Sequence, residues 1–253
     1  MAKIISFLNH KGGVGKTTSA INMGAVLAEM GKRVLLIDLD PQASLTLSLG
    51  VHNCERTIYT ALKETVDSDN GVLPIIPCKT NLSVVPSDRK MADAEYLLLN
   101  ELGRESFLKE LIAPISSNYD YIILDCPPAL GLISINALVA SDHIIVPVQA
   151  EILSLHGLVS IVDVIATVQK KLNKKLAIAG FLMTQYDART GLHRRIVENM
   201  REQYENKVFE SVIRRNIRIS EAPLEKMDII SYDANCSGAN DYIDATKELI
   251  QRV

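Results

Sequence analysis

The strongest constraint on the fold is a stretch near the start of the chain in which an apolar run, a glycine-rich segment and a helical pattern follow one another. The apolar run at residues 4–8 has the length and flanks of a buried strand, and apolar residues recur at helical spacing across residues 17–30, before a helix stop at Gly31. The glycine-rich segment lies between them, at residues 9–16. This order predicts a strand, a tight loop and a helix whose N-terminus faces the loop, which is a favourable site for an anion.

The chemistry of this loop matches what a polyphosphate requires. Gly12, Gly13 and Gly15 are expected to adopt positive φ angles and so to bring backbone N–H groups close to phosphate oxygens. Lys16 is then placed to reach the β- and γ-phosphates, and the hydroxyl of Thr17 to ligate Mg²⁺. A glycine-rich turn that binds nothing is the alternative, but strand, loop, Lys-Thr pair and helix occur in the order that phosphate binding requires. The predicted nucleotide-binding residues of the loop are Lys11, Gly12, Gly13, Val14, Gly15, Lys16, Thr17 and Thr18.

Two positions depart from the general phosphate-loop pattern. His10 stands where the first glycine of G-x-x-x-x-G-K-[ST] is expected, and a second lysine, Lys11, follows it. The segment Lys-Gly-Gly-Val-Gly-Lys-Thr-Thr at residues 11–18 resembles the deviant Walker A motif of the ParA/MinD ATPases. The resemblance implies ATP as the ligand and Lys11 and Lys16 as catalytic residues. It also implies an ATP-dependent homodimer that sandwiches the nucleotides, in which Lys11 reaches into the nucleotide of the partner subunit.

Asp38 and Asp40 come directly after a second apolar run, at residues 33–37. Strand ends carry functional residues in open α/β sheets, and carboxylates beside a phosphate loop can ligate magnesium or position a water molecule. Taken alone, Asp-x-Asp-Pro is equally compatible with an ordinary turn. The segment Asp-Leu-Asp-Pro-Gln at residues 38–42 also resembles the first switch of the ParA/MinD family. This resemblance implies that Asp40 acts catalytically on the attacking water and that Asp38 belongs to the magnesium shell.

Asp125 follows a core strand predicted at residues 119–124, as a Walker B carboxylate does. Such a carboxylate holds a magnesium-bound water against the hydroxyl of Thr17. Capping of the helix that follows is the alternative role for Asp125. The Asp-Cys-Pro-Pro segment again resembles the family, so the predicted metal-site residues are Thr17, Asp38 and Asp125.

Further strands are predicted from short apolar runs, at residues 143–148 and 176–183 and, as a pair, at 74–78 and 82–86. Prolines place the first strand of the pair at an edge, and no strand is predicted beyond residue 183. After residue 148 the chain resembles the family's Q-x-E segment, which gives Glu151 a candidate role at a dimer interface. The matching residues there are Gln149, Glu151, Ser154, Gly157 and Leu158, with His156 where a glutamate is common. Helices are predicted at residues 57–63, 92–102, 105–115, 161–172 and 241–252.

A locally basic stretch spans residues 187–218 in a chain whose net charge is −3. A solvated helix face with i,i+4 ion pairs is one explanation of this stretch. However, the segments 187–190 and 215–223 resemble the chromosomal, Soj-type members of the family. This resemblance implies a non-specific surface for double-stranded DNA and nucleotide contacts near the adenine from Asn216 and Pro223. The predicted DNA-binding residues are Arg189, Arg194, Arg195, Arg214, Arg215 and Arg218.

Composition limits the alternatives. The 253 residues, 47% of them hydrophobic, can bury a large core, and we expect a single domain over residues 1–253. A net charge of −3 and a pI near 6.0 argue against a protein coated in basic surface, so any contact with DNA requires a local patch. The four cysteines lack C-x-x-C spacing, and no apolar run approaches the ~18 residues of a membrane span. With no signal peptide before the first strand, a cytoplasmic protein is expected.

These features predict an α/β P-loop NTPase fold, with a mostly parallel twisted sheet and helices on both faces. The resemblance implies an ATP- and Mg²⁺-dependent DNA-partition ATPase, nucleoid-associated when ATP-bound and stimulated by a ParB-like centromere-binding protein. The main alternative is a MinD-like ATPase that cycles on a membrane at the division site, and the lack of a basic amphipathic tail counts against it. The cysteines lack the paired spacing of metal-cluster ligands, which disfavours a metal-cluster or reductase ATPase. The sequence does not exclude a ligase or kinase of the same superfamily with an additional substrate pocket.

Overall fold

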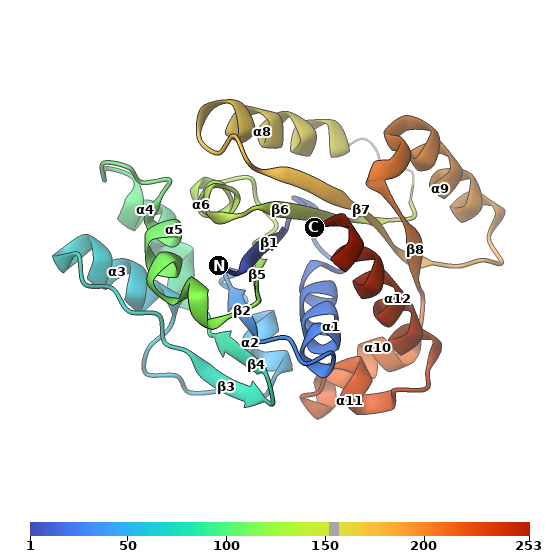
Figure 1. Ribbon diagram of the computed structural model, residues 1–253, viewed down its shortest axis with the longest axis horizontal. Coiled ribbons are helices and arrows are strands. Elements are labelled where there is room, and N and C mark those ends of the chain that lie inside the picture. The colour runs from blue at the N-terminus through green and yellow to red at the C-terminus, as the bar shows by residue number, and fades with distance from the viewer. Residues whose placement is uncertain (152–156) are drawn as a thin grey trace.

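The computed structural model describes residues 1–151 and 157–253, which form a twisted sheet with helices on both faces (Figure 1). Its strands are β1 (Lys3–Phe7), β2 (Val34–Asp38), β3 (Ile76–Lys79), β4 (Leu82–Val85), β5 (Tyr121–Asp125), β6 (His143–Gln149), β7 (Ala177–Tyr186) and β8 (Val208–Arg214). In this described part the eight strands lie in the order β3-β4-β2-β5-β1-β6-β7-β8. Neighbouring strands are parallel except β3 and β4, which are antiparallel at one edge. The mostly parallel α/β sheet predicted from the sequence is confirmed.

Two layers of helices cover the sheet (Figure 1). The α-helices are α1 (Lys16–Glu29), α2 (Ser44–Ser48), α3 (Ile58–Ser68), α4 (Ala94–Leu98), α5 (Phe107–Ile112), α6 (Leu132–Ala140), α8 (Leu158–Lys171), α9 (Gly191–Tyr204), α10 (Ile217–Glu221), α11 (Ile229–Asp233) and α12 (Ser237–Arg252). Short 3₁₀ helices are η1 (Arg89–Asp93), η2 (Ala113–Asn118), η3 (Glu205–Lys207) and η4 (Ala222–Glu225). One apolar cluster packs α3 to α6, α8 and α9 against the sheet, and a second cluster packs α1, α2, α11 and α12 against the opposite face. No helix among the described residues is long and apolar enough to cross a membrane.

The carboxyl ends of β1, β2 and β5 meet at one edge of the sheet. Asp38 and Asp125 are register partners at the ends of β2 and β5, and Phe7 at the end of β1 pairs with Asp125. The glycine-rich loop leaves β1 at this edge, and α1 begins after it at Lys16. The parallel register therefore brings together three segments that the sequence predicted to act at one site.

One strand was not predicted from the sequence. β8 pairs with β7 and forms the edge of the sheet opposite β3. Its buried residues, among them Val208 and Ile213, are separated by more exposed ones, so the apolar run is short. The backbone N–H groups of Glu210 and Ser211 donate to the carboxylate of Glu248 in α12, at 2.8 and 2.9 Å. Contacts from a helix distant in the sequence fix this strand, and the local pattern does not reveal them.

Several predicted helices differ in their ends. The segment 105–115 becomes α5 and η2, and Pro114 at the start of η2 lacks the N–H group that would continue the α-helical hydrogen bonds. In place of the helix predicted at residues 92–102, the short helices η1 and α4 begin earlier, at Arg89, and end earlier, at Leu98. The last helix starts earlier than predicted, at Ser237, where the Cys236 side chain accepts a hydrogen bond from Ala239 N.

Candidate functional site

The glycine-rich loop between β1 and α1 is held by the end of β7. Thr184 Oγ1 donates to the carbonyl of Val14 at 2.8 Å, and Gln185 Nε2 donates to the carbonyl of Gly13 at 2.7 Å. Neither residue was predicted from the sequence to belong to the site. They directly follow the predicted strand at residues 176–183, and strand ends are the positions where such residues gather in α/β sheets. Their position after a predicted strand is the one sequence feature that could have indicated these two residues.

Two of the three loop glycines have the predicted backbone conformation. Gly13 has φ 73° and Gly15 has φ 87°, in a region that residues with side chains rarely adopt. The positive φ predicted for Gly12 was wrong, because the loop makes its left-handed turns at the other two glycines. A Cβ built on Gly12 would meet no atom of the described residues within 4 Å. The conformation of the single chain therefore does not require a glycine at position 12.

Asn9 and His10 join the loop to two other parts of the chain, β6 and the start of α8. Asn9 Nδ2 donates to the carbonyl of Pro147 in β6 at 2.7 Å, and its Oδ1 accepts from Lys11 N at 2.9 Å. The ring of His10 lies so close to Gly157 that a Cβ added there would overlap it. The departure from glycine at position 10 is thus accommodated by a glycine on the other side of the contact.

Lys11 lies in a polar network beyond the end of β6. Its Nζ lies 3.2 Å from Glu151 Oε2 and 3.4 Å from Gln149 Oε1. Gln149 Nε2 in turn donates to Glu151 Oε1 and to Gln185 Oε1, both at 2.9 Å. The residue with a predicted role at a dimer interface, Glu151, therefore contacts the lysine predicted to cross that interface. Ser154 and His156, which the resemblance also covered, lie outside the described residues.

Lys16 is buried at the start of α1, with 6% of its surface exposed. Its Nζ donates to the carbonyl of Lys11 at 3.2 Å. Burial lowers the pKa of Lys16, and the nearby negative groups, first among them Asp125, oppose that shift. A buried ammonium held beside carboxylates is suited to meet the charge of a phosphate.

Asp38 and Asp125 are fully buried at adjacent strand ends but differ in their partners. Asp38 Oδ2 accepts from the N–H and the hydroxyl of Thr46, at 2.9 and 2.7 Å, and Oδ1 accepts from Asp40 N at 3.1 Å. Burial raises the pKa of Asp38 to about 6, against the effect of these hydrogen bonds. Burial and then the charge of Asp38 raise the pKa of Asp125 well above its usual range, while Thr17 and Lys16 oppose the rise. The two carboxylates therefore lack a nearby positive charge sufficient to balance both.

Asp125 and Thr17 have the oxygen atoms that a magnesium ion requires. Both carboxylate oxygens of Asp125 are buried, and neither has a donor in full hydrogen-bond geometry among the described residues, which is unusual for a buried acid. The Thr17 side chain nevertheless lies near enough to lower the pKa of Asp125. In the described part of the chain, no group of three or more His, Cys, Asp or Glu side chains is placed to hold a metal by itself. Mg²⁺ is usually bound through one or two carboxylates together with phosphate oxygens and water. The residues fit that mode of binding.

A cavity of about 620 Å³ adjoins the loop, between α1, the ends of β7 and β8, α10 and α12. Asn216 and Pro223, predicted to lie near the adenine, both line it, together with Gly15 and Thr18. The Asn216 side chain is fixed, since its Nδ2 donates to Ser237 Oγ at 2.7 Å and its Oδ1 accepts from a backbone N–H. The sequence segments 11–18 and 215–223 thus share the walls of one cavity.

Two segments that contain predicted DNA-binding arginines meet at the ends of β7 and β8. Tyr186 of β7 pairs with Arg214 of β8, and Arg215 N donates to the Tyr186 carbonyl at 2.9 Å. Because Arg189 follows the end of β7 closely in sequence, the two arginine-containing segments begin at the same edge of the sheet. The structure therefore brings together two parts of the predicted surface that are 25 residues apart.

The six arginines differ in their ion pairs. Arg189 pairs with Asp187 at 2.8 Å, Arg214 with Asp241 at 2.6 Å, and Arg218 with Glu221 at 3.1 Å and with Asp233 at 3.6 Å. Arg194, Arg195 and Arg215 are exposed and have no ion pair within residues 1–151 and 157–253. The Arg214 guanidinium is engaged by both oxygens of Asp241, which ties the end of β8 to α12.

The chain is similar to known proteins over its whole length. A family model described as an AAA domain matches residues 2–178. The sporulation initiation inhibitor protein Soj of Bacillus subtilis is 46% identical over 253 residues, which cover 98% of each chain. The chromosome-partitioning ATPase Soj of Treponema pallidum is 40% identical over 252 residues, covering 100% of this chain and 98% of that protein. This chain belongs to the ParA/MinD family of P-loop ATPases.

A solved structure shares the fold of this ParA/MinD-family chain. Cobyrinic acid a,c-diamide synthase of Mycobacterium smegmatis, determined with bound ADP and magnesium, superimposes with a TM-score of 0.85. The two chains are 32% identical, and the match covers 99% of this chain and 95% of the other. The P-loop α/β fold predicted from the sequence is thereby confirmed over nearly the entire length.

Proposed function

We propose that this chain is a ParA/Soj-type partition ATPase, which hydrolyses ATP in the presence of Mg²⁺ and binds DNA as an ATP-dependent homodimer. One observation supports this most directly. The buried ammonium of Lys16 lies at a glycine-rich loop beside Asp125, a buried carboxylate whose oxygens have no partner among the described residues. At such a site Mg²⁺ would balance the charge of the carboxylate, and the phosphates of ATP would meet the ammonium of Lys16.

Within this proposal the loop residues bind the phosphates, and the two acids at the strand ends serve the magnesium ion. Lys16 and the N–H groups at the start of α1 bind the β- and γ-phosphates, and Thr17 and Asp125 hold the magnesium ion. Bound magnesium would neutralise charge on the phosphate oxygens. Asp38 belongs to the outer shell of the ion, since its oxygens already accept hydrogen bonds from Thr46 and Asp40. Lys16 is assigned to stabilise the charge that develops on the transferred phosphoryl group and on the leaving oxygen of ADP.

Asp40 is assigned to the attacking water. It lies two residues beyond β2 and is only half-buried, so solvent reaches it, in contrast to Asp38. Its Oδ1 accepts from Gln42 N at 2.9 Å, which fixes the carboxylate on the loop that follows β2. A carboxylate in this position orients a water molecule and accepts its proton.

The dimer and the DNA surface complete the proposal. Lys11 crosses between the two subunits, after exchanging its contact with Glu151 for the phosphates of the partner's ATP. Arginines at the ends of β7 and β8 bind the DNA backbone without reading its sequence, because phosphate contacts carry no base information. Hydrolysis separates the subunits and releases the DNA, and a ParB-like protein stimulates that step. A protein acting in this way is cytoplasmic and associates with the nucleoid while it holds ATP.

The test is DNA binding with and without ATP, using unrelated duplexes, wild-type protein and Asp40→Ala. Wild-type protein should bind every duplex only when ATP and Mg²⁺ are present, and should dissociate as ATP is consumed. Asp40→Ala should bind ATP and DNA normally but hydrolyse ATP about a hundredfold more slowly, because it loses the group that positions the water. It should therefore stay on the DNA. Binding that ignores ATP, or wild-type turnover in Asp40→Ala, would contradict the proposal.

The diamide synthase fold match gives a second candidate, an ATP-dependent amide ligase. The identity of 32% to that protein is lower than the 40% and 46% to the two Soj proteins, which favours partition. ATP hydrolysis that requires a carboxylic acid and an amide donor, and is unaffected by DNA, would support the ligase instead.

A further inference from the structure

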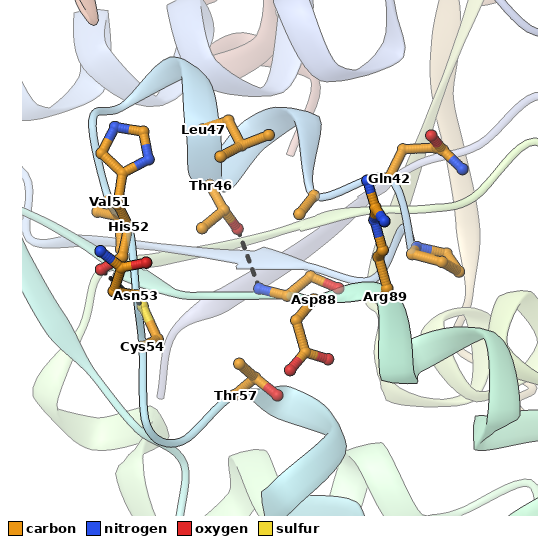
Figure 2. A pocket seen from close by; sticks show the side chains of 13 residues that line it. Gln42, Thr46, Leu47, Val51, His52, Asn53, Cys54, Thr57, Asp88 and Arg89 are labelled. Atoms are coloured by element: carbon orange, nitrogen blue, oxygen red, sulfur yellow. Dashed lines mark hydrogen bonds between the residues drawn. The ribbon is translucent and has the colours of Figure 1, made fainter.

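A second cavity lies at the same edge of the sheet as the glycine-rich loop, at the ends of β2 and β4 (Figure 2). Its volume is about 580 Å³, close to the 620 Å³ of the cavity beside Asn216, where the adenine of ATP is expected. The two cavities share no lining residue, so the proposed ATPase activity leaves this one unexplained. Its volume is within the range of sites that bind small molecules.

Buried hydroxyl groups form the floor of this cavity. Thr46, Thr57 and Ser87 are 3%, 2% and 4% exposed. Thr46 Oγ1 is already engaged, since it accepts from Ser87 N at 3.0 Å, the bond drawn in Figure 2, and donates to Asp38 at 2.7 Å. Ser87 Oγ is buried and has no hydrogen-bond partner within the described residues, although nearly all buried polar atoms have one. A ligand with hydroxyl groups of its own would supply that partner.

A carboxylate follows Ser87 directly in the sequence. Asp88 is half-buried and is the one acid among the described residues that line the cavity. Its Oδ1 accepts from Lys90 N at 3.0 Å, whereas its Oδ2 has no hydrogen bond or ion pair in the described chain. A carboxylate with an available oxygen is the group that accepts from the ribose hydroxyls in dinucleotide-binding α/β proteins. Asp88 and Ser87 therefore suit the neighbouring hydroxyls of a sugar.

An unpaired cation lies at the mouth of the cavity. Arg89 is exposed and lines the cavity, and its guanidinium has no ion pair or hydrogen bond with any residue that the structure describes. Figure 2 shows its side chain directed away from the Asp88 carboxylate. Because these neighbouring charges do not neutralise each other, each is available to a different part of one ligand. A guanidinium binds a phosphate through paired hydrogen bonds.

Leu47 and Val51 form an apolar wall, and His52 lies next to them in the lining. Leu47 is 49% exposed, and Val51 is half-buried. A heterocyclic base packs on apolar side chains and stacks on an aromatic ring. Figure 2 shows this wall on one side of the cavity and Arg89 on the other, with Asp88 between them. A nucleoside monophosphate has its parts in the same order, with the base at one end, the ribose in the middle and the phosphate at the other end.

Other classes of ligand leave part of this lining without a partner. A small cation would meet Asp88 but would be repelled by Arg89. Inorganic phosphate would contact Arg89 and leave the hydroxyl groups of the floor unused. A free sugar phosphate would leave the apolar wall exposed to water. The lining as a whole therefore favours a ribonucleotide.

We propose that this cavity is a second nucleotide site, which binds a ribonucleoside monophosphate. Asp88 and Ser87 bind the hydroxyls of the ribose, and Arg89 binds the phosphate. The base packs on the wall formed by Leu47 and Val51. The site is separate from the glycine-rich loop, so this ligand and ATP are bound at the same time.

The test is NMR titration of the full-length protein with AMP. The amide signals of Asn53 and Ser87 report on the second site, and those of Gly15 and Thr18 report on the cavity beside the loop, so binding at the two places is measured separately. AMP should shift the signals of Asn53 and Ser87. 2′-Deoxy-AMP should bind there about tenfold more weakly, the effect of losing one hydrogen bond to a charged acceptor. Ribose 5-phosphate should also bind more weakly than AMP, because it lacks the base.

Substitutions test the two charged residues one at a time. Asp88→Asn should weaken AMP binding at the second site about tenfold, although asparagine can keep the bond to Lys90 N. Arg89→Ala should weaken the binding of AMP but not that of adenosine, because it removes the partner of the phosphate alone. The matched controls are Asp93→Asn and Lys90→Ala, which change exposed residues of the same 3₁₀ helix outside the cavity and should bind AMP like the wild type.

AMP that shifted the signals of Gly15 and Thr18 alone would overturn the second site. Equal binding of AMP and 2′-deoxy-AMP, or wild-type affinity in Asp88→Asn, would contradict the assignment of the ribose to Asp88. Ribose 5-phosphate that bound as tightly as AMP would contradict the assignment to a nucleotide. None of these results depends on ATP hydrolysis or on DNA, so a failure of the proposed partition function would leave them unchanged.

Discussion

The nucleotide site and the proposed DNA surface, both at the carboxyl ends of the strands, hold their charges in opposite ways. At the ends of β1, β2 and β5, the charged residues Lys16, Asp38 and Asp125 are all less than 10% exposed. Arg189, just beyond β7, and Arg194, in α9, lie in solvent. A buried charge must be compensated at short range, so its position and partners are fixed by strand register. An exposed charge is screened, and its role depends on which acids happen to lie beside it.

This difference predicts how the two regions respond to substitution. Removing one buried charge leaves its partners uncompensated in a region of low dielectric constant. The effect should therefore be large, and it should be confined to the binding of the nucleotide. Removing one exposed arginine takes away one of several similar contacts, so the effect should be smaller and should depend on salt.

The largest effect is expected for Lys16→Ala. ATP affinity should fall at least about a hundredfold, or roughly 3 kcal/mol, because a buried charged partner of the phosphates is lost. The control is Lys32→Ala, which removes an exposed lysine just beyond α1 and should leave ATP affinity unchanged. Isothermal titration measures both variants, and thermal unfolding shows whether each remains folded. A folded Lys16→Ala that binds ATP like the wild type would mean that the buried region does not bind the phosphates.

Gly12→Val should separate ATP binding from dimer formation. A Cβ at Gly12 meets no described atom of its own chain within 4 Å, and the φ angle there does not require glycine. The variant should therefore fold and bind ATP as a monomer, whereas facing loops in a sandwich dimer would leave no room for the side chain. Light scattering with ATP and Mg²⁺ gives the oligomeric state. An ATP-dependent dimer of Gly12→Val would contradict a sandwich with these loops at closest approach.

The buried region could be predicted from the sequence because its chemistry is local. The Gly-Lys-Thr spacing fixed Lys16 at the start of a helix, and the apolar runs placed Asp38 and Asp125 at strand ends, where parallel register brings them together. The difference between these two acids was not visible. It arises because Thr46, eight residues after Asp38, donates two hydrogen bonds to that carboxylate alone.

The arginine surface could be predicted only in outline. The sequence indicated six arginines in one basic stretch, but their ion pairs depend on tertiary contacts. Arg214 is paired with Asp241, 27 positions away, and β8, which carries it, was missed because its fixing contacts come from α12. The pattern of residues within a short stretch of sequence does not reveal contacts between residues that are this far apart in the chain.

Arg194→Ala should lower DNA affinity more than Arg189→Ala. Arg194 has no ion pair within the described residues, whereas Arg189 must exchange Asp187 for a phosphate. In a symmetric dimer, Arg194→Ala should reduce the slope of log K against log salt by about two, one for each lost phosphate contact. Arg189→Ala should change the slope less, and both variants should bind ATP normally. Equal changes in slope would show that exposed ion pairs open freely on DNA and that pairing does not rank these arginines.

The smallest effect is expected at Glu248, which holds the strand that carries Arg214. Burial by itself raises the pKa of Glu248, but hydrogen bonds from Ser211, Glu210 and Arg252 outweigh it, so the pKa is lowered. A carboxyl whose pKa is lower in the folded state contributes stability above its unfolded pKa of about 4.3, and this contribution is lost as the pH falls through the folded pKa.

Glu248→Gln should therefore reduce the free energy of unfolding by about 1 kcal/mol at pH 7, and the difference from the wild type should shrink below about pH 4. Urea unfolding at the two pH values measures this, with the exposed Glu202→Gln on α9 as the control. Hydrogen exchange should become faster at the amides of β8, while those of the glycine-rich loop and α1 keep their protection, because β8 is an edge strand and the loop is held by β7. A loss of protection that spread equally to the loop would show that the two regions unfold as one unit. The two regions would then differ in the burial of their charges but not in their local stability.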